Sequence, residues 1–213
     1  MIAHSRPAAG KGDDPRRMNE VLDVSARLFN ARGYGQTTLA EVAAELRMNK
    51  ASLYHYVRSK EELLQRLMYR AAQPLRDLAR DPSLATLAPA AALERMVREH
   101  CRVILAHRHE YGTLIRQRPH IALEALAPIA RRERAYAAAL RRVIERVAAS
   151  GRACPDPALA TQLTLDAVNS ILRWFRPRGR LSQTQVIDQV WLYVAGAVGI
   201  AVKAPRQSLA EAA

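Results

Sequence analysis

The boundary signals of three short helices within the first 60 residues constrain the fold most strongly. Asp14-Pro15 is an N-cap followed by a residue whose fixed φ suits the first helical position, and Gly33 supplies a stop. A capping box spans Thr38–Glu41, and Asn49 can cap a third helix. Three short amphipathic helices, the last two separated by a tight turn, are typical of a helix-turn-helix.

The remainder of the chain also favours helices. Aromatic residues make up only 5% of the chain and Gly and Pro are few, so little in the composition favours sheets. The fold class we predict is all-α, with nine to ten helices in total. A fourth helix is expected to open at Ser59–Glu62 and to be kinked or ended near Pro74. The next helix should run from about Pro89 to His107, followed by two short helices over Glu110–Leu126 that Pro119 interrupts. Three longer helices should then run from Pro128 to Ser150-Gly151, from Asp156-Pro157 to Phe175, and from Ser182 to about Lys203.

This pattern predicts two folded domains between flexible ends. We expect a flexible basic arm over residues 1–14, a helix-turn-helix DNA-binding domain over 15–60, a larger helical domain over 61–205, and a flexible tail over 206–213.

The formal charge of +13 indicates a polyanionic partner, with nucleic acid the first candidate. Residues 1–60 carry a net charge of +4 and the rest of the chain carries +9, so most of the excess lies outside the predicted DNA-binding segment. Only four of the 33 basic residues are lysine, and a coding bias toward Arg and Ala explains the excess equally well.

Several classes of protein are disfavoured. The longest apolar run, Val190–Val202, has 13 residues where a bilayer needs about 20, so no membrane partner is expected. The start of the chain lacks a signal-peptide core, and Cys101 and Cys154 do not form a disulfide framework, which favours the cytoplasm. No phosphate loop, nucleophile elbow or metal-ligand spacing occurs, so we expect no enzymatic activity, catalytic residue, metal or cofactor.

The segment Val21–Leu64 resembles the amino-terminal domain of TetR/AcrR-family transcriptional regulators. The strings Arg32-Gly33-Tyr34, Lys50–Tyr56 and Ser59–Leu64 carry the resemblance, and Arg47 departs from it because the family usually has Gly in this turn. A helix N-terminus and a hydroxyl suit a phosphate, and the first turn of a recognition helix reaches base edges. The DNA-binding residues that the resemblance implies are Thr37, Thr38, Lys50, Ala51, Ser52, Tyr54, His55, Tyr56 and Lys60.

A helix-turn-helix protein that binds two operator half-sites needs to be a symmetric homodimer. In the resembled family the last two helices of each protomer form a four-helix bundle. We therefore expect the dimer interface at Ile171, Val190, Val194, Ala197 and Val198, with burial of this apolar run inside one protomer as the alternative.

The string Asp166–Ser182 looks like the corresponding segment of a TetR subgroup that responds to acyl-CoA thioesters. Such a ligand needs arginines for its phosphates beside an apolar cavity, although for any one arginine a solvated surface charge is the more common role. The expected ligand-binding residues are Met96, His100, Arg116, Tyr136, Asn169, Arg173 and Trp174.

The function that follows is a ligand-responsive transcriptional regulator, most simply a repressor. It would bind a palindromic double-stranded DNA operator as a dimer and be released by a small effector such as an acyl-CoA. Two alternatives stay open: a TetR-type regulator of efflux or stress genes with a promiscuous apolar pocket, and a sequence-indifferent basic DNA-binding protein.

Overall fold

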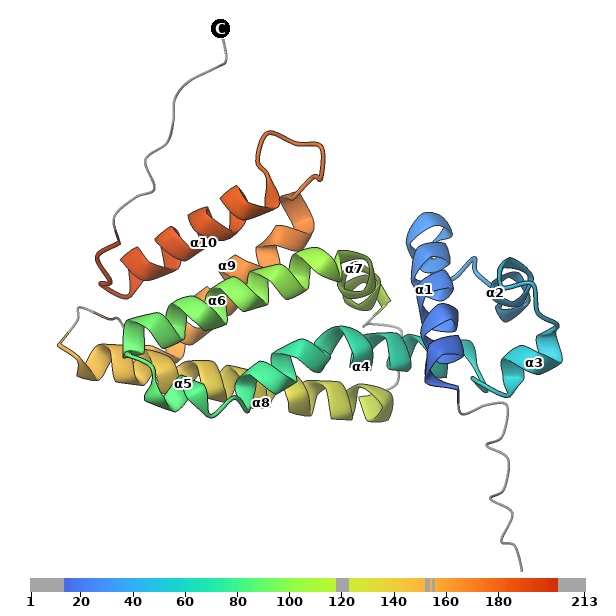
Figure 1. The fold of residues 1–213 in the computed structure, drawn as a ribbon, viewed down its shortest axis with the longest axis horizontal. Helices are drawn as coiled ribbons and strands as arrows, with labels where there is room; N and C mark the ends of the chain where they lie inside the picture. Colours follow the sequence, from blue (N-terminus) through green and yellow to red (C-terminus); the bar gives the residue numbers. More distant parts are fainter. Residues whose placement is uncertain (1–13, 118–122, 152–153, 155, 203–213) are drawn as a thin grey trace, which may run out of the picture. The chain divides into compact units, whose positions relative to one another are not determined.

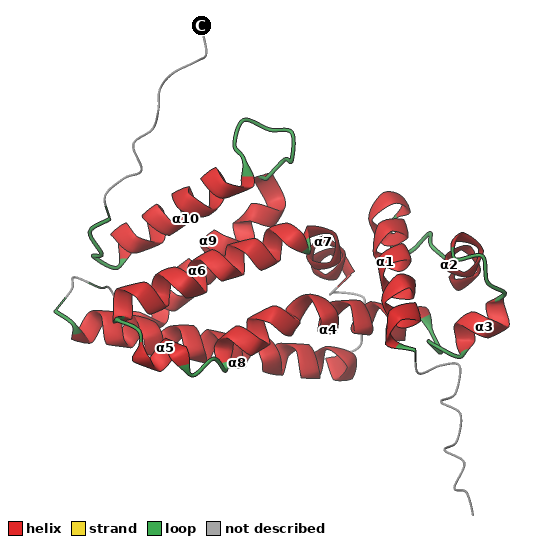
Figure 2. Cartoon of the chain, viewed as in Figure 1, coloured by secondary structure: helices red, strands yellow, loops and turns green. Residues whose placement is uncertain are grey.

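The computed structural model describes residues 14–117, 123–151, 154 and 156–202. Every regular element in these residues is a helix, and no strand occurs among them (Figure 2). The helices are labelled in Figure 1: α1 (Pro15–Arg32), α2 (Leu39–Glu45), α3 (Lys50–Tyr54), α4 (Lys60–Ala79), α5 (Ser83–Thr86), α6 (Pro89–Ala106), α7 (Arg108–Gln117), α8 (Leu123–Ala149), α9 (Pro157–Trp174) and α10 (Gln183–Ala197).

The predicted helix starts are confirmed by their capping hydrogen bonds. Asp14 accepts from the Arg16 N–H at 2.9 Å, and Asn49 accepts from the Ser52 N–H at 2.7 Å. Reciprocal capping boxes open α2 at Thr38 and α10 at Ser182. These starts were predictable because each depends only on residues within one helical turn.

Two helices differ from the prediction. Pro128 does not begin the long helix; it lies inside α8, which starts at Leu123. The helix continues because residues on both sides of Pro128 are good helix formers and pack into a core, which compensates for one missing backbone donor. The short α5 has no side-chain cap and was not predicted. The expected break at Pro119, residues 1–13 of the arm expected over 1–14, and the tail over 206–213 lie outside the described residues.

The chain divides into two compact units that do not coincide with simple halves of the sequence. The first comprises Met1–Gln73 and His107–Ala130, and the second comprises Pro74–Ala106 and Arg131–Ala213. The domain boundaries that we proposed at residues 60 and 205 are not tested by this division and stay a prediction.

The first unit is held together by an apolar core under the short helices. Val21 and Phe29 of α1, Val42 of α2 and Leu53 of α3 are each at most 1% exposed and belong to one cluster. The ring of Phe29 meets that of Tyr34 edge to face, with 5.1 Å between centroids. Because α3 has only five residues, its position depends on this packing and its cap, and not on intrinsic helix stability.

One arginine connects three helices of the first unit. Arg70 of α4 donates to the Asp23 carboxylate of α1 at 2.7 Å and to the Glu110 carboxylate of α7 at 3.4 Å. The hydroxyl of Tyr111 donates to the Ala71 carbonyl at 3.1 Å, which also joins α7 to α4. Helix α7 is therefore part of the same unit as the short helices, although it is distant in sequence.

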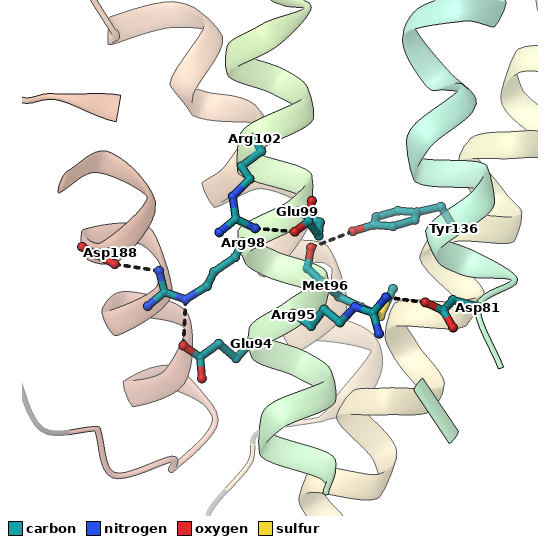
Figure 3. A network of polar contacts seen from close by, with 9 residues as sticks. All are labelled: Asp81, Glu94, Arg95, Met96, Arg98, Glu99, Arg102, Tyr136 and Asp188. Carbon is teal, nitrogen blue, oxygen red and sulfur yellow. Dashed lines mark hydrogen bonds and ion pairs between the residues drawn. The ribbon is translucent and has the colours of Figure 1, made fainter. Parts of the chain in front are cut away.

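The second unit is built on α6, α9 and α10, which pack against one another (Figure 1). Arg98 of α6 donates to Glu94 at 2.7 Å and to Asp188 of α10 at 2.6 Å, and Arg95 forms an ion pair with Asp81 (Figure 3). Arg146 of α8 donates to two carbonyls of the α5 region at 2.6 and 2.7 Å. These bonds fix the helix surfaces that carry the predicted effector and interface residues.

Candidate functional site

The turn between α2 and α3 has the geometry of a helix C-terminal motif that normally requires glycine. The Met48 N–H donates to the Ala43 carbonyl at 2.9 Å, and the Arg47 N–H donates to the Ala44 carbonyl at 3.0 Å. This is the pair of bonds in a Schellman motif, which places Arg47 in the left-handed region with φ of 53°. A non-glycine residue in this conformation costs about 1 kcal/mol. Arg47, which stands where the family usually has Gly, therefore adopts the same turn with a strained backbone.

The first turn of α3 presents the predicted base-reading residues to solvent. Lys50 and Ala51 are exposed and Ser52 is half-buried, whereas Leu53 is fully buried and anchors the helix to the core. His55 is also exposed. A short helix that is anchored on one face and open at its N-terminal turn can enter a major groove.

The two tyrosines of the recognition segment differ in burial. Tyr54 is 44% exposed, and the Lys50 ammonium lies 5.7 Å from its ring centroid. Tyr56 is half-buried and packs against the core of the first unit. Tyr54 is thus the tyrosine whose hydroxyl is available to a phosphate, and Tyr56 contributes to packing as well.

The structure corrects the expected role of Thr37. Its side chain is fully buried, and its hydroxyl donates to the Gly33 carbonyl at 2.9 Å. Thr38 is exposed, and its hydroxyl is the N-cap acceptor for the Glu41 N–H at 3.2 Å. The sequence could not separate the two because they are adjacent and chemically identical, and only the fold determines which one faces the core.

Lys60, which was expected to contact DNA, is engaged within the chain. Its ammonium donates to the carbonyls of Tyr34, Gly35 and Thr37 at 2.9, 3.3 and 3.1 Å, and it lies 4.5 Å from the Tyr34 ring centroid. All three N–H donors are therefore used to hold the α1–α2 connection. Burial, followed by the neighbouring Glu61 carboxylate, raises the pKa of Tyr34 to about 12.

Most of the residues expected at the dimer interface are buried inside their own protomer, which corrects that expectation. Ile171, Val194 and Val198 are each 1% exposed within the single chain, and Val190 is 9% exposed. Only Ala197 of the expected set is exposed. The sequence missed this because the second half of α10, Val190–Ala197, has no charged or amide side chain, so its periodicity does not say which face covers the core of its own protomer.

A different set of apolar side chains on α9 and α10 faces outward. Leu159, Leu163 and Trp174 of α9 and Tyr193 of α10 are 46–66% exposed. The signal that could have found the first two is their spacing of four residues, which places them on one helix face. A groove of about 420 Å³ is lined by Leu163, Asp166, Ala167, Ser170, Trp174, Gln189, Val190 and Tyr193.

The predicted effector residues separate into an interior group and surface groups. Met96, His100 and Tyr136 lie together inside the second unit. The rings of His100 and Tyr136 meet edge to face, with 5.0 Å between their centroids. The Tyr136 hydroxyl donates to the Met96 carbonyl at 3.4 Å (Figure 3). Complete burial lowers the pKa of His100 to about 3, so its imidazole is neutral at neutral pH.

The other four expected effector residues are exposed. Asn169, Arg173 and Trp174 lie on the surface of α9, and the Trp174 indole N–H donates to the Ser170 hydroxyl at 3.0 Å. Arg116 is on α7 in the other unit. Within the second unit, Asn169, Arg173 and Trp174 are therefore on the surface and apart from the buried group, and Trp174 lines the α9–α10 groove.

A basic segment spans the last turn of α9 and the loop after it. Arg173, Arg176, Arg178 and Arg180 are all exposed, and none forms an ion pair with a carboxylate in the described part of the chain. Arg176 instead donates to the carbonyls of Arg173 and Phe175, both at 3.2 Å. The segment presents unneutralised guanidinium groups that suit phosphate.

A second hollow of about 440 Å³ was not predicted. Its polar edge is the Arg98 network in Figure 3, and its apolar part comes from α6, α10 and the residues after α10. Its lining residues are Ala90, Ala91, Glu94, Arg98, Asp188, Trp191, Leu192, Ile200, Ala201 and Val202.

The fold and the open recognition turn define a helix-turn-helix regulator with a separate helical domain. The family model described as bacterial regulatory proteins, tetR family, matches residues 21–67. A second model, described as tetracyclin repressor-like, C-terminal domain, matches residues 86–198, more than half of the chain. The chain belongs to the TetR family.

Relatives and solved structures agree with this assignment. The HTH-type transcriptional repressor KstR2 of Rhodococcus jostii is 26% identical over 186 residues, covering 86% of this chain and 91% of the relative. AibR in complex with isovaleryl coenzyme A and operator DNA is 28% identical with a TM-score of 0.72, covering 86% and 99% of the two chains. PfmR from Thermus thermophilus is 26% identical with a TM-score of 0.76 and the same coverage.

In the residues that the structure describes, no helix combines the length and the apolar character needed to cross a membrane.

Proposed function

We propose that this chain is a TetR-family transcriptional repressor that binds a palindromic operator as a homodimer and dissociates when a small effector binds. The observation that carries the proposal is the recognition helix α3, whose first turn is open to solvent while Leu53 anchors it to the core. The relative KstR2 is itself named a transcriptional repressor, which supports this direction of regulation.

The DNA contacts we propose come from two helices. Lys50, Ala51 and Ser52 read base edges, and Thr38, Tyr54, His55 and Tyr56 contact the phosphates and sugars that flank the groove. Protein–DNA contacts of the second kind fix the register without reading sequence. We do not expect catalysis, and a regulator of transcription acts where the DNA lies, in the cytoplasm.

The homodimer is proposed to form through the exposed face of α9 and α10. Leu159, Leu163, Trp174 and Tyr193 line this face, and large exposed apolar side chains gathered on one surface mark an association site. A two-fold axis through this face would cover the same residues on both protomers, which is the self-complementarity that a symmetric dimer requires.

The effector we propose is an acyl-CoA thioester. Support comes from AibR, whose structure contains isovaleryl coenzyme A, and from the exposed arginines at and after the end of α9, which form no ion pair with a carboxylate in the described part of the chain. The phosphates of coenzyme A would bind Arg173 and its neighbours, and the acyl group would approach the neutral side chains of Met96, His100 and Tyr136. The ligand would then favour a conformation with lower operator affinity.

A mobility-shift titration on the region upstream of the chain's own gene tests the proposal. Excess unrelated duplex should leave the complex intact, isovaleryl-CoA should release it, and isovalerate alone should act weakly. Arg173→Ala should bind DNA normally but respond less to isovaleryl-CoA, whereas Arg142→Ala, an exposed arginine of α8, should respond as the parent chain does.

Two outcomes would favour the alternatives. Competition by unrelated duplex as effective as by the upstream region indicates a sequence-indifferent binder. Equal release by isovalerate or by uncharged aromatic compounds indicates a promiscuous apolar pocket and contradicts a phosphate-binding role for Arg173.

A further inference from the structure

The turn of the helix-turn-helix contains the one described non-glycine residue with a positive φ, and this residue is an arginine. We propose that Arg47 is an additional DNA-contacting residue whose guanidinium binds a backbone phosphate beside the recognition helix. The inference rests on the proposed function as a DNA-binding regulator, and it adds a contact that the family resemblance does not supply.

The backbone geometry fixes where Arg47 stands. Its own N–H and that of Met48 are both bonded to carbonyls of α2, so Arg47 lies at the position after the helix where glycine is favoured. The Arg17 guanidinium donates to the neighbouring Leu46 carbonyl at 3.1 Å, which also holds the turn in place. Glycine would adopt this turn without strain, so the presence of an arginine at a strained position indicates that its side chain has a function.

The side chain of Arg47 is not used within the chain. Two nearby arginines of α1 form ion pairs with carboxylates of α2: Arg27 with Glu45 at 3.5 Å and Arg32 with Glu41 at 2.9 Å. Arg47 is exposed and forms no hydrogen bond or ion pair through its guanidinium with any residue that the structure describes. It therefore remains available to an external anion.

The placement of Arg47 identifies this anion as a DNA phosphate. Arg47 lies two residues before Asn49, the N-cap of α3, so the two Cα atoms are separated by at most about 7 Å. It is followed closely by Lys50, the predicted base-reading lysine, and by the open end of the recognition helix. A guanidinium next to a helix that enters the major groove lies near the phosphates that border this groove.

A local role at the end of α2 is the competing explanation, because a cation near a helix C-terminus is stabilising. The two roles predict opposite changes in thermal stability. Replacing Arg47 by Gly removes the strain of the left-handed backbone conformation. The melting temperature should then rise by about 2–4 °C if the arginine side chain acts only by binding DNA. If the arginine instead stabilises the C-terminal end of α2, the melting temperature should fall.

The experiment measures melting temperature and the salt dependence of binding to a mixed-sequence duplex for the full chain and for Arg47→Gly, Arg47→Asn and Arg47→Lys. Asn tolerates the left-handed region without charge, and Lys keeps the charge. For a dimer, Gly and Asn should make the slope of log affinity against log salt shallower by about 1.8, or about 0.9 per protomer, and Lys should retain the parent slope.

Each result bears on a different claim. A parent chain that binds no duplex overturns the proposed function and this contact with it. A parent chain that binds, together with Gly and Asn variants of unchanged slope, overturns only the Arg47 contact. A lower melting temperature for Arg47→Gly contradicts the strain argument and assigns the side chain to the helix end.

Discussion

Replacing Lys60 by Met tests whether this lysine supports the site from inside the protein. Methionine keeps the apolar length of the side chain but removes three hydrogen bonds from the ammonium to the carbonyls of Tyr34, Gly35 and Thr37. It also removes the ammonium from the Tyr34 ring. The carbonyls belong to the segment that leads into α2, so the substitution should loosen the start of that helix.

The expected magnitude follows from these contacts. A hydrogen bond to a charged group contributes about 1.5–3 kcal/mol when shielded, and the partial exposure of Lys60 reduces this figure. We expect a total loss of about 2–3 kcal/mol in the free energy of unfolding. For a chain of 213 residues this lowers the melting temperature by roughly 5–10 °C.

Thermal and urea unfolding of the full chain measure this loss, with Arg58→Met as the matched control. Arg58 lies two residues away and its side chain is exposed, so its replacement should change stability by less than about 0.5 kcal/mol. If Lys60→Met unfolds like the parent chain but binds DNA weakly, the positioning role is refuted and Lys60 acts on a phosphate, as the sequence first suggested.

Three further predictions concern the interface, the interior and the recognition helix. Tyr193→Glu should give monomers in sedimentation, because it places a charge on the exposed apolar face that we propose as the dimer interface. The control Arg142→Glu should sediment as the parent chain does. A Tyr193→Glu variant that is still a dimer would show that the interface lies elsewhere. His100 has its pKa lowered from 6.5 to about 3 in the folded chain, so the stability it contributes is complete above pH 6.5 and is lost as pH falls toward 3, by about 1.4 kcal/mol per pH unit. His100→Gln should flatten this part of the stability profile, and an unchanged profile would show that other groups cause it. Lys50→Ala should alter sequence preference, whereas Tyr54→Phe should weaken binding to all duplexes alike; equal effects on operator and unrelated DNA for both would contradict the assignment of α3 as the recognition helix.

The parts of the fold that could be predicted from the sequence are those set by neighbouring residues. The caps at Asp14, Thr38, Asn49 and Ser182 are confirmed because each bond spans at most three residues. The exposure of Lys50 and the burial of Leu53 also follow from helical periodicity over one short element.

The parts that could not be predicted depend on contacts between distant segments. Lys60 donates to carbonyls 23 to 26 residues earlier in the chain, and its sequence neighbours alone could not show this contact. Helix α10 packs against α6 and α9, and its Val190 and Val194 are buried while Tyr193 between them faces outward. The second half of α10, Val190–Ala197, has no charged or amide side chain to distinguish these directions.

Selection of bound sequences from a random duplex pool tests the central claim most directly, namely that two copies of α3 read symmetric half-sites. The account predicts a palindrome whose half-site centres are separated by about one helical turn, or about 10 base pairs, or a multiple of it. It further predicts that Lys50→Ala selects a changed base in both half-sites. Enrichment of no sequence, or of a single site without two-fold symmetry, would contradict the account.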